Sequence, residues 1–310
     1  MAARTVTAVR VVAVVVTFNR LTLLQGLVTR LREVPEVAEI LVVDNASSDG
    51  TGQWLTSHSD VVSRTLPENL GGAGGFHNGL GWAMARGADL VWLMDDDGLP
   101  DLDCLPVLLE HQSELDFWGP IVVAEDDLDD AEHPARLVFP IRLPGTATVL
   151  RTTADVARHA PLLRDVVIPF NGVLVTRDLV ERVGLPRAEF FIWGDDVEYL
   201  WRARQAGARV ATIAGARVRH PRVGDLGTPM MFGRTTYNHT PSDLKHYCMA
   251  RNNLVNLRTY RGPLPALAFV VKTLWFYLFT SPSAARLKLS ARGMTAGLRG
   301  DFTGHQKYLR

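Results

Sequence analysis

Three consecutive aspartates, Asp95, Asp96 and Asp97, directly follow the apolar run "LVWLM". Adjacent carboxylates repel, and burying any of them is unfavourable, so this cluster calls for a counter-charge. Mg²⁺ and Mn²⁺ prefer oxygen ligands, and Mg²⁺ usually combines one or two carboxylates with substrate phosphates. Alternate side chains of an extended stretch share a face, so we expect Asp95 and Asp97 to bind one ion while Asp96 points elsewhere. Ordinary turn chemistry at Asp97 and Gly98 is the alternative.

Polar or glycine-rich segments also follow the three earlier apolar runs. They read "TFNR" (17–20), "DNASSDGT" (44–51) and "NLGGAGG" (69–75). In an open parallel sheet, ligands bind outside the carboxyl ends of the strands, so four such ends predict one ligand site.

The glycines at 71–75 have two readings: a flexible loop, or backbone that approaches a bulky ligand closely. Their spacing is not that of a dinucleotide-binding loop, and the chain has no phosphate-binding GxxxxGK[ST] motif. A nicotinamide-binding unit and a P-loop ATPase are therefore disfavoured.

The elements that must position these residues alternate along the first third of the chain. Continuous apolar runs are typical of strands buried on both faces, and the segments between them show helical spacing. This predicts a parallel sheet with helices on both faces. The expected strands are 9–18, 38–44, 61–66 and 88–95, and the expected helices are 20–34, 47–58 and the later part of 71–87.

The remainder of the chain is less regular. The acidic stretch 124–134 is predicted to be a solvated loop rather than a metal site. A helix is expected from about 195 to 206, and a strand after it. A second helical pattern covers 243–262. The apolar segment 263–283, interrupted by Lys272, and the basic segment 285–300 follow.

Composition narrows the function classes. The chain has 310 residues, of which 47% are apolar and 21% charged, and its net charge is zero. This is ordinary globular composition, with no global electrostatic case for binding nucleic acid. Cys104 and Cys248 belong to no metal or redox motif, which favours reduced thiols and a cytoplasmic location. The apolar N-terminus lacks a cleavage signal and is predicted to be a strand.

In this order, "VVVTFNR", "LVVDNASSDGT", "NLGGAGGFHNGL" and "LMDDDG" resemble the motifs of an inverting family 2 glycosyltransferase of the GT-A fold. The later "FFIWGDDVEY" is similar to the acidic motif that carries the family's catalytic base. Within the family, the chain looks most like the mycobacterial-type galactofuranosyltransferases, and its length is similar to that of the enzyme that initiates galactan on a lipid-linked acceptor. The resemblance covers roughly residues 10–225. It implies an α/β, Rossmann-like, mostly parallel sheet flanked by helices, with a C-terminal helical segment.

The resemblance also implies a site for the sugar nucleotide at the strand ends. Asp44 would contact the uridine, and Thr17, Phe18 and Arg20 would line the same pocket. The remaining donor-binding positions would be Asn69, Gly71, Gly72 and Asp96, the last of which faces the donor sugar.

Mn²⁺ or Mg²⁺ would be the cofactor in this family. By resemblance, Asp95 and Asp97 would ligate the ion that holds the diphosphate, and His220 matches the third ligand. A lone histidine is more often structural, but its place after the helix and strand at 195–213 favours the ligand role.

Asp196, the second acid of "WGDD", would be the catalytic base. Asp195 would bind the acceptor, for which helix capping is the alternative. Trp193 would offer an apolar face to an acceptor sugar ring, or else would simply pack in the core.

The implied reaction is a metal-dependent inverting transfer of galactofuranose from UDP-galactofuranose to a rhamnosyl-N-acetylglucosaminyl-diphospho-polyprenol, in synthesis of cell-wall arabinogalactan. The alternatives are a rhamnosyltransferase that uses dTDP-rhamnose and, as a different class, a nucleotide-sugar-binding protein without turnover.

The expected domains are a catalytic region at 1–235 and a C-terminal helical region at 236–310. The catalytic region would divide into a nucleotide-binding half at about 1–100 and an acceptor half at about 101–235.

The apolar segment 263–283, followed by basic residues, predicts peripheral contact with the inner face of the plasma membrane. The alternative is a helix packed on the catalytic region or on another subunit of a homo-oligomer.

Overall fold

The computed structural model describes residues 9–127, 132–168, 170–223 and 227–309. The predicted acidic loop at 124–134 therefore lies partly outside the described residues. The chain forms two compact units that are interleaved in sequence. The first unit consists of Gly75–Leu185, Ala206–Arg222 and the described residues up to Asn69. The second consists of Leu70–Gly74, Pro186–Gln205 and the described residues from Val223 onward. These two units therefore differ from the expected domains at 1–235 and 236–310, because the second unit also includes residues before position 235.

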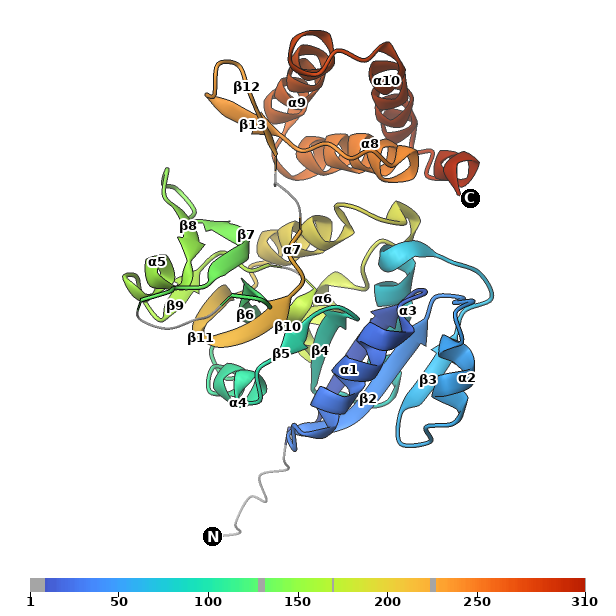
Figure 1. Cartoon of the computed structure of the whole chain (residues 1–310), viewed down its shortest axis with the longest axis vertical. Helices are drawn as coiled ribbons and strands as arrows, with labels where there is room; N and C mark the ends of the chain where they lie inside the picture. The colour runs from blue at the N-terminus through green and yellow to red at the C-terminus, as the bar shows by residue number, and fades with distance from the viewer. Residues whose placement is uncertain (1–8, 128–131, 169, 224–226, 310) are drawn as a thin grey trace. The chain divides into compact units, whose positions relative to one another are not determined.

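The first four strands of the first unit pair in parallel (Figure 1). β1 (Val11–Thr17) is entirely buried and lies between β2 (Val37–Asp44) and β4 (Leu90–Asp95). β3 (Val62–Thr65) pairs with β2 on its other side. Continuous apolar sequence suits strands that are covered on both faces. The predicted strand positions are confirmed.

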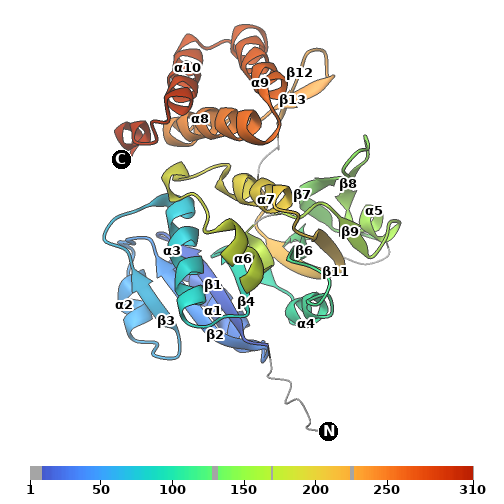
Figure 2. The ribbon, with the colours of Figure 1, turned by 180° about the vertical axis from the view of Figure 1, so that it is seen from behind.

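Helices cover both faces of this sheet. On one face, α1 (Leu21–Arg32), α2 (Thr51–Thr56) and α4 (Cys104–Leu109) contribute to a large apolar core with the strands (Figure 1). On the other face lie α3 (Gly71–Ala85) and α6 (Arg177–Val183), which Figure 2 shows from behind.

The second half of the sheet mixes strand directions. β10 (Asn171–Thr176) runs antiparallel between β4 and β6 (Phe117–Ala124), and β6 pairs in parallel with β11 (Val210–His220). The smaller elements are β5 (Leu99–Pro100), β7 (Arg136–Arg142), β8 (Val149–Thr152), α5 (Thr153–Ala157) and β9 (Leu162–Arg164). The result is a central sheet that is mostly parallel and flanked by helices, as predicted.

The glycine-rich segment departs from expectation, because α3 begins at Gly71 and includes all the glycines. A β-carbon on Gly75 would lie 2.3 Å from a methyl carbon of Val16, and one on Gly79 would lie 2.4 Å from a methyl carbon of Val14. Neither distance is compatible with a side chain. Glycine at these two positions therefore allows α3 to pack closely on β1. The prediction of a flexible loop at 71–75 is wrong.

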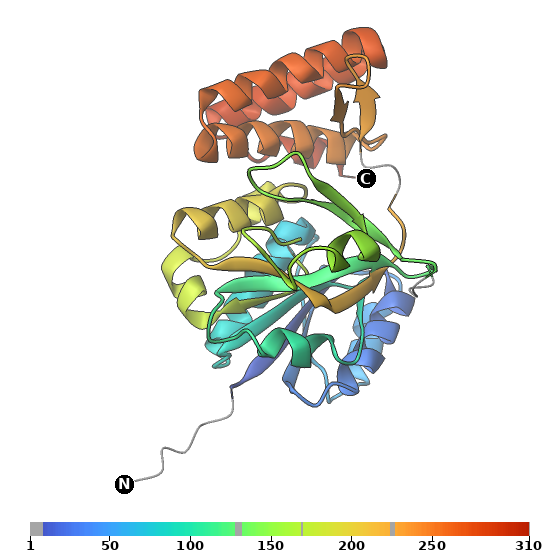
Figure 3. The same ribbon diagram turned by 90° about the vertical axis from the view of Figure 1, so that its left-hand side faces the viewer.

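The second unit contains three helices that pack side by side (Figure 3). α8 (Asp243–Tyr260) contacts both α9 (Pro263–Trp275) and α10 (Ala284–Arg299), and a π-helical turn, Phe276–Thr280, continues α9. The other elements are η1 (Ala188–Phe190), α7 (Asp195–Gln205), β12 (Thr228–Met230), β13 (Thr235–Tyr237) and η3 (Gly304–Tyr308).

Local signals separate these three helices. Gly262, with φ of 91°, precedes Pro263, the first residue of α9. Proline suits this position because a backbone N–H there would have no partner within the helix. The Ser283 side chain accepts a hydrogen bond from the backbone N–H of Arg286 and caps α10, which ends at the left-handed Gly300. The predicted helices at 195–206 and 243–262 are confirmed as α7 and α8.

Candidate active site

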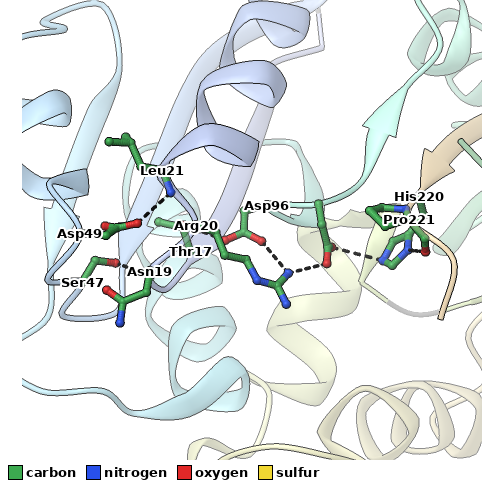
Figure 4. Close-up of polar contacts among 10 residues, drawn as sticks. Thr17, Asn19, Arg20, Leu21, Ser47, Asp49, Asp96, His220 and Pro221 are labelled. Atoms are coloured by element: carbon green, nitrogen blue, oxygen red, sulfur yellow. Dashed lines mark hydrogen bonds and ion pairs between the residues drawn. The ribbon is translucent and has the colours of Figure 1, made fainter. Parts of the chain in front are cut away.

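The aspartate triplet lies where β4 ends in a turn. Exposure alternates along it, since Asp96 is buried while Asp95 and Asp97 are half-buried. The Asp96 side chain is directed into the first unit, where Thr17 Oγ1 donates to Asp96 Oδ2 at 2.7 Å. Arg20 Nη1 donates to Asp96 Oδ1 at 3.1 Å and also to Asp97 Oδ2. One half-exposed guanidinium thus joins two of the three carboxylates (Figure 4).

His220, the last residue of β11, faces the same turn. Its Nε2 lies 3.2 Å from Asp97 Oδ1, and its Nδ1 lies 2.6 Å from the carbonyl oxygen of Pro221 (Figure 4). Donation from Nδ1 to that carbonyl leaves Nε2 directed at Asp97. The structure therefore brings together two residues that are 123 positions apart in the sequence, His220 at the end of β11 and Asp97 in the turn after β4.

Burial and charge act in opposite directions on this cluster. Burial raises the pKa of Asp96, although Thr17 and Arg20 oppose it. Burial also acts on Asp97, but the hydrogen bond and charge of His220, together with Arg20, outweigh it and lower the pKa of Asp97. Burial disfavours the charged form of His220, yet Asp97 outweighs that effect and raises the pKa of His220.

A divalent ion fits part of this arrangement. The Asp97 carboxylate and His220 Nε2 face each other, and the Nδ1 contact to a backbone carbonyl is the kind that orients metal-ligating histidines. Within the described residues, however, no group of three or more His, Cys, Asp or Glu side chains is arranged to hold a metal ion. Two of the three predicted ligands thus lie together, and the place of Asp95 in the set stays a prediction.

The loops after β1 and β2 are tied to each other. The backbone N–H of Asn19 donates to Ser47 Oγ at 2.9 Å, and that of Leu21 donates to Asp49 Oδ2 at 2.9 Å (Figure 4). Asn19 has φ of 53°, in the left-handed region that asparagine tolerates. These contacts fix the backbone on both sides of Arg20 and connect two of the four predicted strand ends.

The predicted nucleotide-binding residues differ in accessibility. Asp44 is fully buried, and its carboxylate accepts from the backbone N–H of Ser47 at 3.0 Å and from Thr65 Oγ1 at 3.1 Å. Thr17 is also buried, whereas Phe18 is 41% exposed. Asp44 therefore orders the loop after β2, and contact with a uridine stays a prediction.

The predicted donor-binding residues Asn69, Gly71 and Gly72 lie at the start of α3. Asn69 ends a segment of the first unit, and the two glycines belong to the second. Gly71 has φ of 69°, and a β-carbon there would lie 2.0 Å from the carbonyl oxygen of Phe191. Gly71 is thus required by the second unit's own packing, while Gly72 has open space around it.

The "WGDD" motif lies in the second unit. Asp195 and Asp196 are in the first turn of α7, where the helix dipole favours negative charge, and Asp196 Oδ1 accepts from the backbone N–H of Val197 at 2.7 Å. Burial outweighs this effect. Burial, and then the charge of Asp196, raise the pKa of Asp195 to about 8, and burial also raises the pKa of Asp196. Trp193, just before them, is half-buried with φ of 72°.

Sequence reasoning missed the residues of α8 that contact this motif. Arg251, Asn252 and Asn256 are all buried and donate to backbone carbonyls between Phe190 and Gly194. A signal was present, since Asn252 and Asn256 are four residues apart and share one helical face with the apolar Cys248.

Comparison with known proteins identifies the family. The family model described as "Glycosyl transferase family 2" matches residues 12–168. The chain belongs to glycosyltransferase family 2. It is 32% identical over 305 residues to galactofuranosyltransferase GlfT1 of Mycolicibacterium smegmatis, covering 94% of this chain and 97% of that protein. It is also 25% identical over 259 residues to the dTDP-rhamnosyl transferase RfbF of Shigella flexneri, covering 81% of each.

A solved structure shows the same fold. The glycosyltransferase GalNAc-T7, crystallised with UDP, GalNAc and Mn²⁺, superimposes with a TM-score of 0.57 at 13% sequence identity, over 95% of this chain and 55% of that one. The expectation of a GT-A fold is thereby confirmed, and the chain is a glycosyltransferase by family.

Proposed function

We propose that this glycosyltransferase transfers galactofuranose from UDP-galactofuranose, with inversion, to a rhamnosyl-N-acetylglucosaminyl-diphospho-polyprenol in arabinogalactan synthesis. The observation that carries the proposal is the similarity to galactofuranosyltransferase GlfT1, which spans nearly the whole of both chains. The match includes both the first unit, with its acidic turn, and the second unit, with "WGDD". The reaction takes place in the cytoplasm in this proposal.

The first unit would bind the sugar nucleotide. Arg20 lies beside Asp96 and Asp97 with half of its side chain exposed, so its guanidinium can reach a diphosphate while the carboxylates hold it in place. Asp97 and His220, with Asp95 as the predicted third ligand, would hold Mn²⁺ or Mg²⁺, which when bound stabilises the charge on the diphosphate leaving group by several kcal/mol.

The second unit would activate the acceptor. An acceptor hydroxyl must lose its proton as it attacks the anomeric carbon, and a positioned carboxylate accelerates such a step by about 10²–10⁴-fold. Asp196 has a raised pKa and a half-buried side chain, which suits a base that takes up a proton during the reaction. Asp195 would contact the acceptor, and Trp193 would lie against one of its sugar rings.

A lipid-linked acceptor requires access to the membrane. Within the described chain, one helix, Pro263–Thr280, is long and apolar enough to cross a membrane, and 22% of it is buried. Because Ala266, Thr273 and Phe276 on one side of it are buried in the second unit, we favour peripheral attachment through the opposite side. Here residues 1–235 would form the catalytic region, and residues 236–310 would supply the attachment.

The test is a transfer assay with purified protein, UDP-galactofuranose and a synthetic acceptor of the stated structure, with and without a chelator. We expect metal-dependent formation of one product and strong loss of donor binding in Asp97→Asn. The control is Asp60→Asn, since Asp60 is an exposed carboxylate paired with Arg32 on the surface. Activity undiminished by the chelator would refute the metal role, and no transfer of galactofuranose would refute the proposed donor.

The second candidate is a rhamnosyltransferase that uses dTDP-rhamnose, and the similarity to RfbF favours it. A competition assay with equal concentrations of both sugar nucleotides decides between the two. We expect galactofuranose in the product, and rhamnose there would establish the alternative. Tight UDP binding with no product from either donor would indicate a binding protein without turnover.

A further inference from the structure

The backbone that precedes Asp195 has an unusual conformation. Phe191, Trp193 and Gly194 have φ values of 65°, 72° and 84°, in the left-handed region that side chains disfavour. At Phe191, ψ is −65°, and the N–H of Ile192 donates to the carbonyl of Phe190 at 2.8 Å. This is the rare, strained form of γ-turn. Such conformations persist only where the surroundings hold them in place, and they cluster at active sites.

Every carbonyl oxygen from residue 190 to residue 194 accepts a hydrogen bond, and most of the donors are side chains of α8. Asn252 Nδ2 lies 3.0 Å from the oxygen of Phe190, 3.1 Å from that of Ile192 and 2.7 Å from that of Trp193. Asn256 Nδ2 donates to the Gly194 oxygen at 2.7 Å. One amide nitrogen thus contacts three carbonyls of the turn.

Arg251 completes this set. It is fully buried, and its Nη2 donates to the oxygen of Phe190 at 2.8 Å and its Nη1 to that of Phe302 at 2.9 Å. Its Nε donates to Asn252 Oδ1 at 2.8 Å and thereby orients the Asn252 amide. Burial lowers the pKa of Arg251. Burying a guanidinium and two amides is unfavourable unless they are hydrogen-bonded, and apolar side chains would fill the same space without that requirement.

The start of α7 is attached to α8 as well. Glu198, which is 1% exposed, receives hydrogen bonds from Tyr260 of α8 and from Arg202. Gly194 has no room for a side chain without strain, because its φ is positive and a β-carbon would lie 3.3 Å from Asn256 Nδ2. The turn and the first turn of α7 are therefore fixed to the same face of one helix.

We propose that Arg251, Asn252 and Asn256 are positioning residues, which hold the turn at 190–194 and so orient Asp195 and Asp196 for reaction. This inference rests on the proposed function only in its assignment of Asp196 as the base. The structural part of the inference, that α8 holds the turn, depends only on the hydrogen bonds described above.

The experiment compares Asn252→Leu, Asn256→Ala and the nearly isosteric Asn252→Asp with Thr259→Val, a change on the exposed side of α8. Misplacement of a reacting group by about 1 Å can cost 10²-fold in rate, so we expect kcat about 10²-fold lower in Asn252→Leu with an unchanged Kd for UDP. As the turn opens, water reaches the two aspartates and lowers their pKa values, so the acidic limb of the pH–rate profile should move to lower pH. Thr259→Val should match the wild type.

Hydrogen exchange of residues 190–198, followed by mass spectrometry, tests whether α8 holds the turn at 190–194. This measurement needs no substrate. We expect faster exchange there in the asparagine variants. Their global unfolding midpoints should show that they are still folded under the assay conditions. Unchanged exchange would overturn the inference. The inference would also be overturned if kcat fell only in proportion to the folded fraction and the pH–rate profile did not move. If the wild type transfers no galactofuranose, the proposed function fails, while the exchange data still decide the role of α8.

Discussion

Two carboxylates in this protein have pKa values displaced in opposite directions, and the directions suit different tasks. Asp97 has a lowered pKa, because His220 and Arg20 outweigh its burial, and a residue that stays ionised suits binding of a cation. Partial burial disfavours the charged form of Asp196 and raises its pKa, and a base works best with a pKa near the operating pH. The two local environments are therefore consistent with the proposed roles of Asp97 as a metal ligand and of Asp196 as the base.

The first prediction concerns the base. We expect Asp196→Asn to lower kcat by about 10²–10⁴-fold while the Kd for UDP changes little, since an amide keeps the shape but cannot take up the proton. Steady-state kinetics and titration calorimetry with UDP measure the two quantities. Asp178→Asn, at an exposed position in α6, is the matched control and should retain wild-type kinetics. Near-normal turnover of Asp196→Asn would show that another group is the base.

The second prediction concerns stability and pH. Asp195 has a pKa of about 8 in the folded protein, against an ordinary value near 4, so the folded state binds a proton that the unfolded state releases. This contribution is complete below about pH 4 and is lost as the pH rises toward 8. We expect the free energy of unfolding to fall by about 1–3 kcal/mol between pH 5 and pH 8 relative to Asp195→Asn. Urea denaturation at a series of pH values measures it, and parallel curves for both proteins would contradict it.

At the scale of elements, the strands of the parallel half could be predicted because each is a continuous apolar run ended by a polar signal. The start of α3 could not, since its glycines serve contacts with Val14 and Val16 that lie far away in sequence. The approach of His220 to Asp97 depends on β11 pairing beside β6, which no local pattern encodes. The spacing of Asn252 and Asn256 places both amides on one face of α8, but the sequence does not show that this face meets the backbone at 190–194.

The third prediction tests the close packing of α3 on β1. We expect Gly79→Ala to lower the free energy of unfolding by about 1–3 kcal/mol, because the new methyl group would overlap the buried, rigid side chain of Val14. Gly26→Ala is the control, since Gly26 is an exposed interior residue of α1 with open space around it. That change should stabilise the protein by about 0.5–1 kcal/mol through helix propensity. Thermal unfolding followed by circular dichroism measures both, and stabilisation by Gly79→Ala would refute the packing argument.

At the scale of the whole molecule, charge is distributed unevenly along a chain whose net charge is zero. Residues 243–310 contain eleven Lys or Arg, of which Arg251 is fully buried, and two Asp or Glu. In the same region, α9 and the turn after it carry a row of exposed apolar side chains at helical spacing, which are Leu264, Leu267, Val271, Leu274 and Leu278. Apolar side chains close to basic ones are the combination that binds anionic membrane surfaces.

The last prediction is that this row attaches the protein to anionic lipid. We expect the wild type to sediment with vesicles that contain phosphatidylglycerol, more weakly with purely zwitterionic vesicles, and less at high salt, since each basic residue near the surface contributes about 1 kcal/mol. Replacing Leu267 and Leu274 together by Ser should weaken binding by about 10–100-fold. A leucine contributes about 1.5–3 kcal/mol when it is fully buried, and these two, which are 59% and 42% exposed, have only about half of that left to gain. Leu23→Ser is the control, as Leu23 is 41% exposed on α1 of the first unit and Leu274 is 42% exposed. Binding that resists alkaline carbonate would indicate a spanning helix instead. Loss of a dimer in Leu267→Ser/Leu274→Ser, without any change in vesicle binding, would show that a second copy of the chain covers the row.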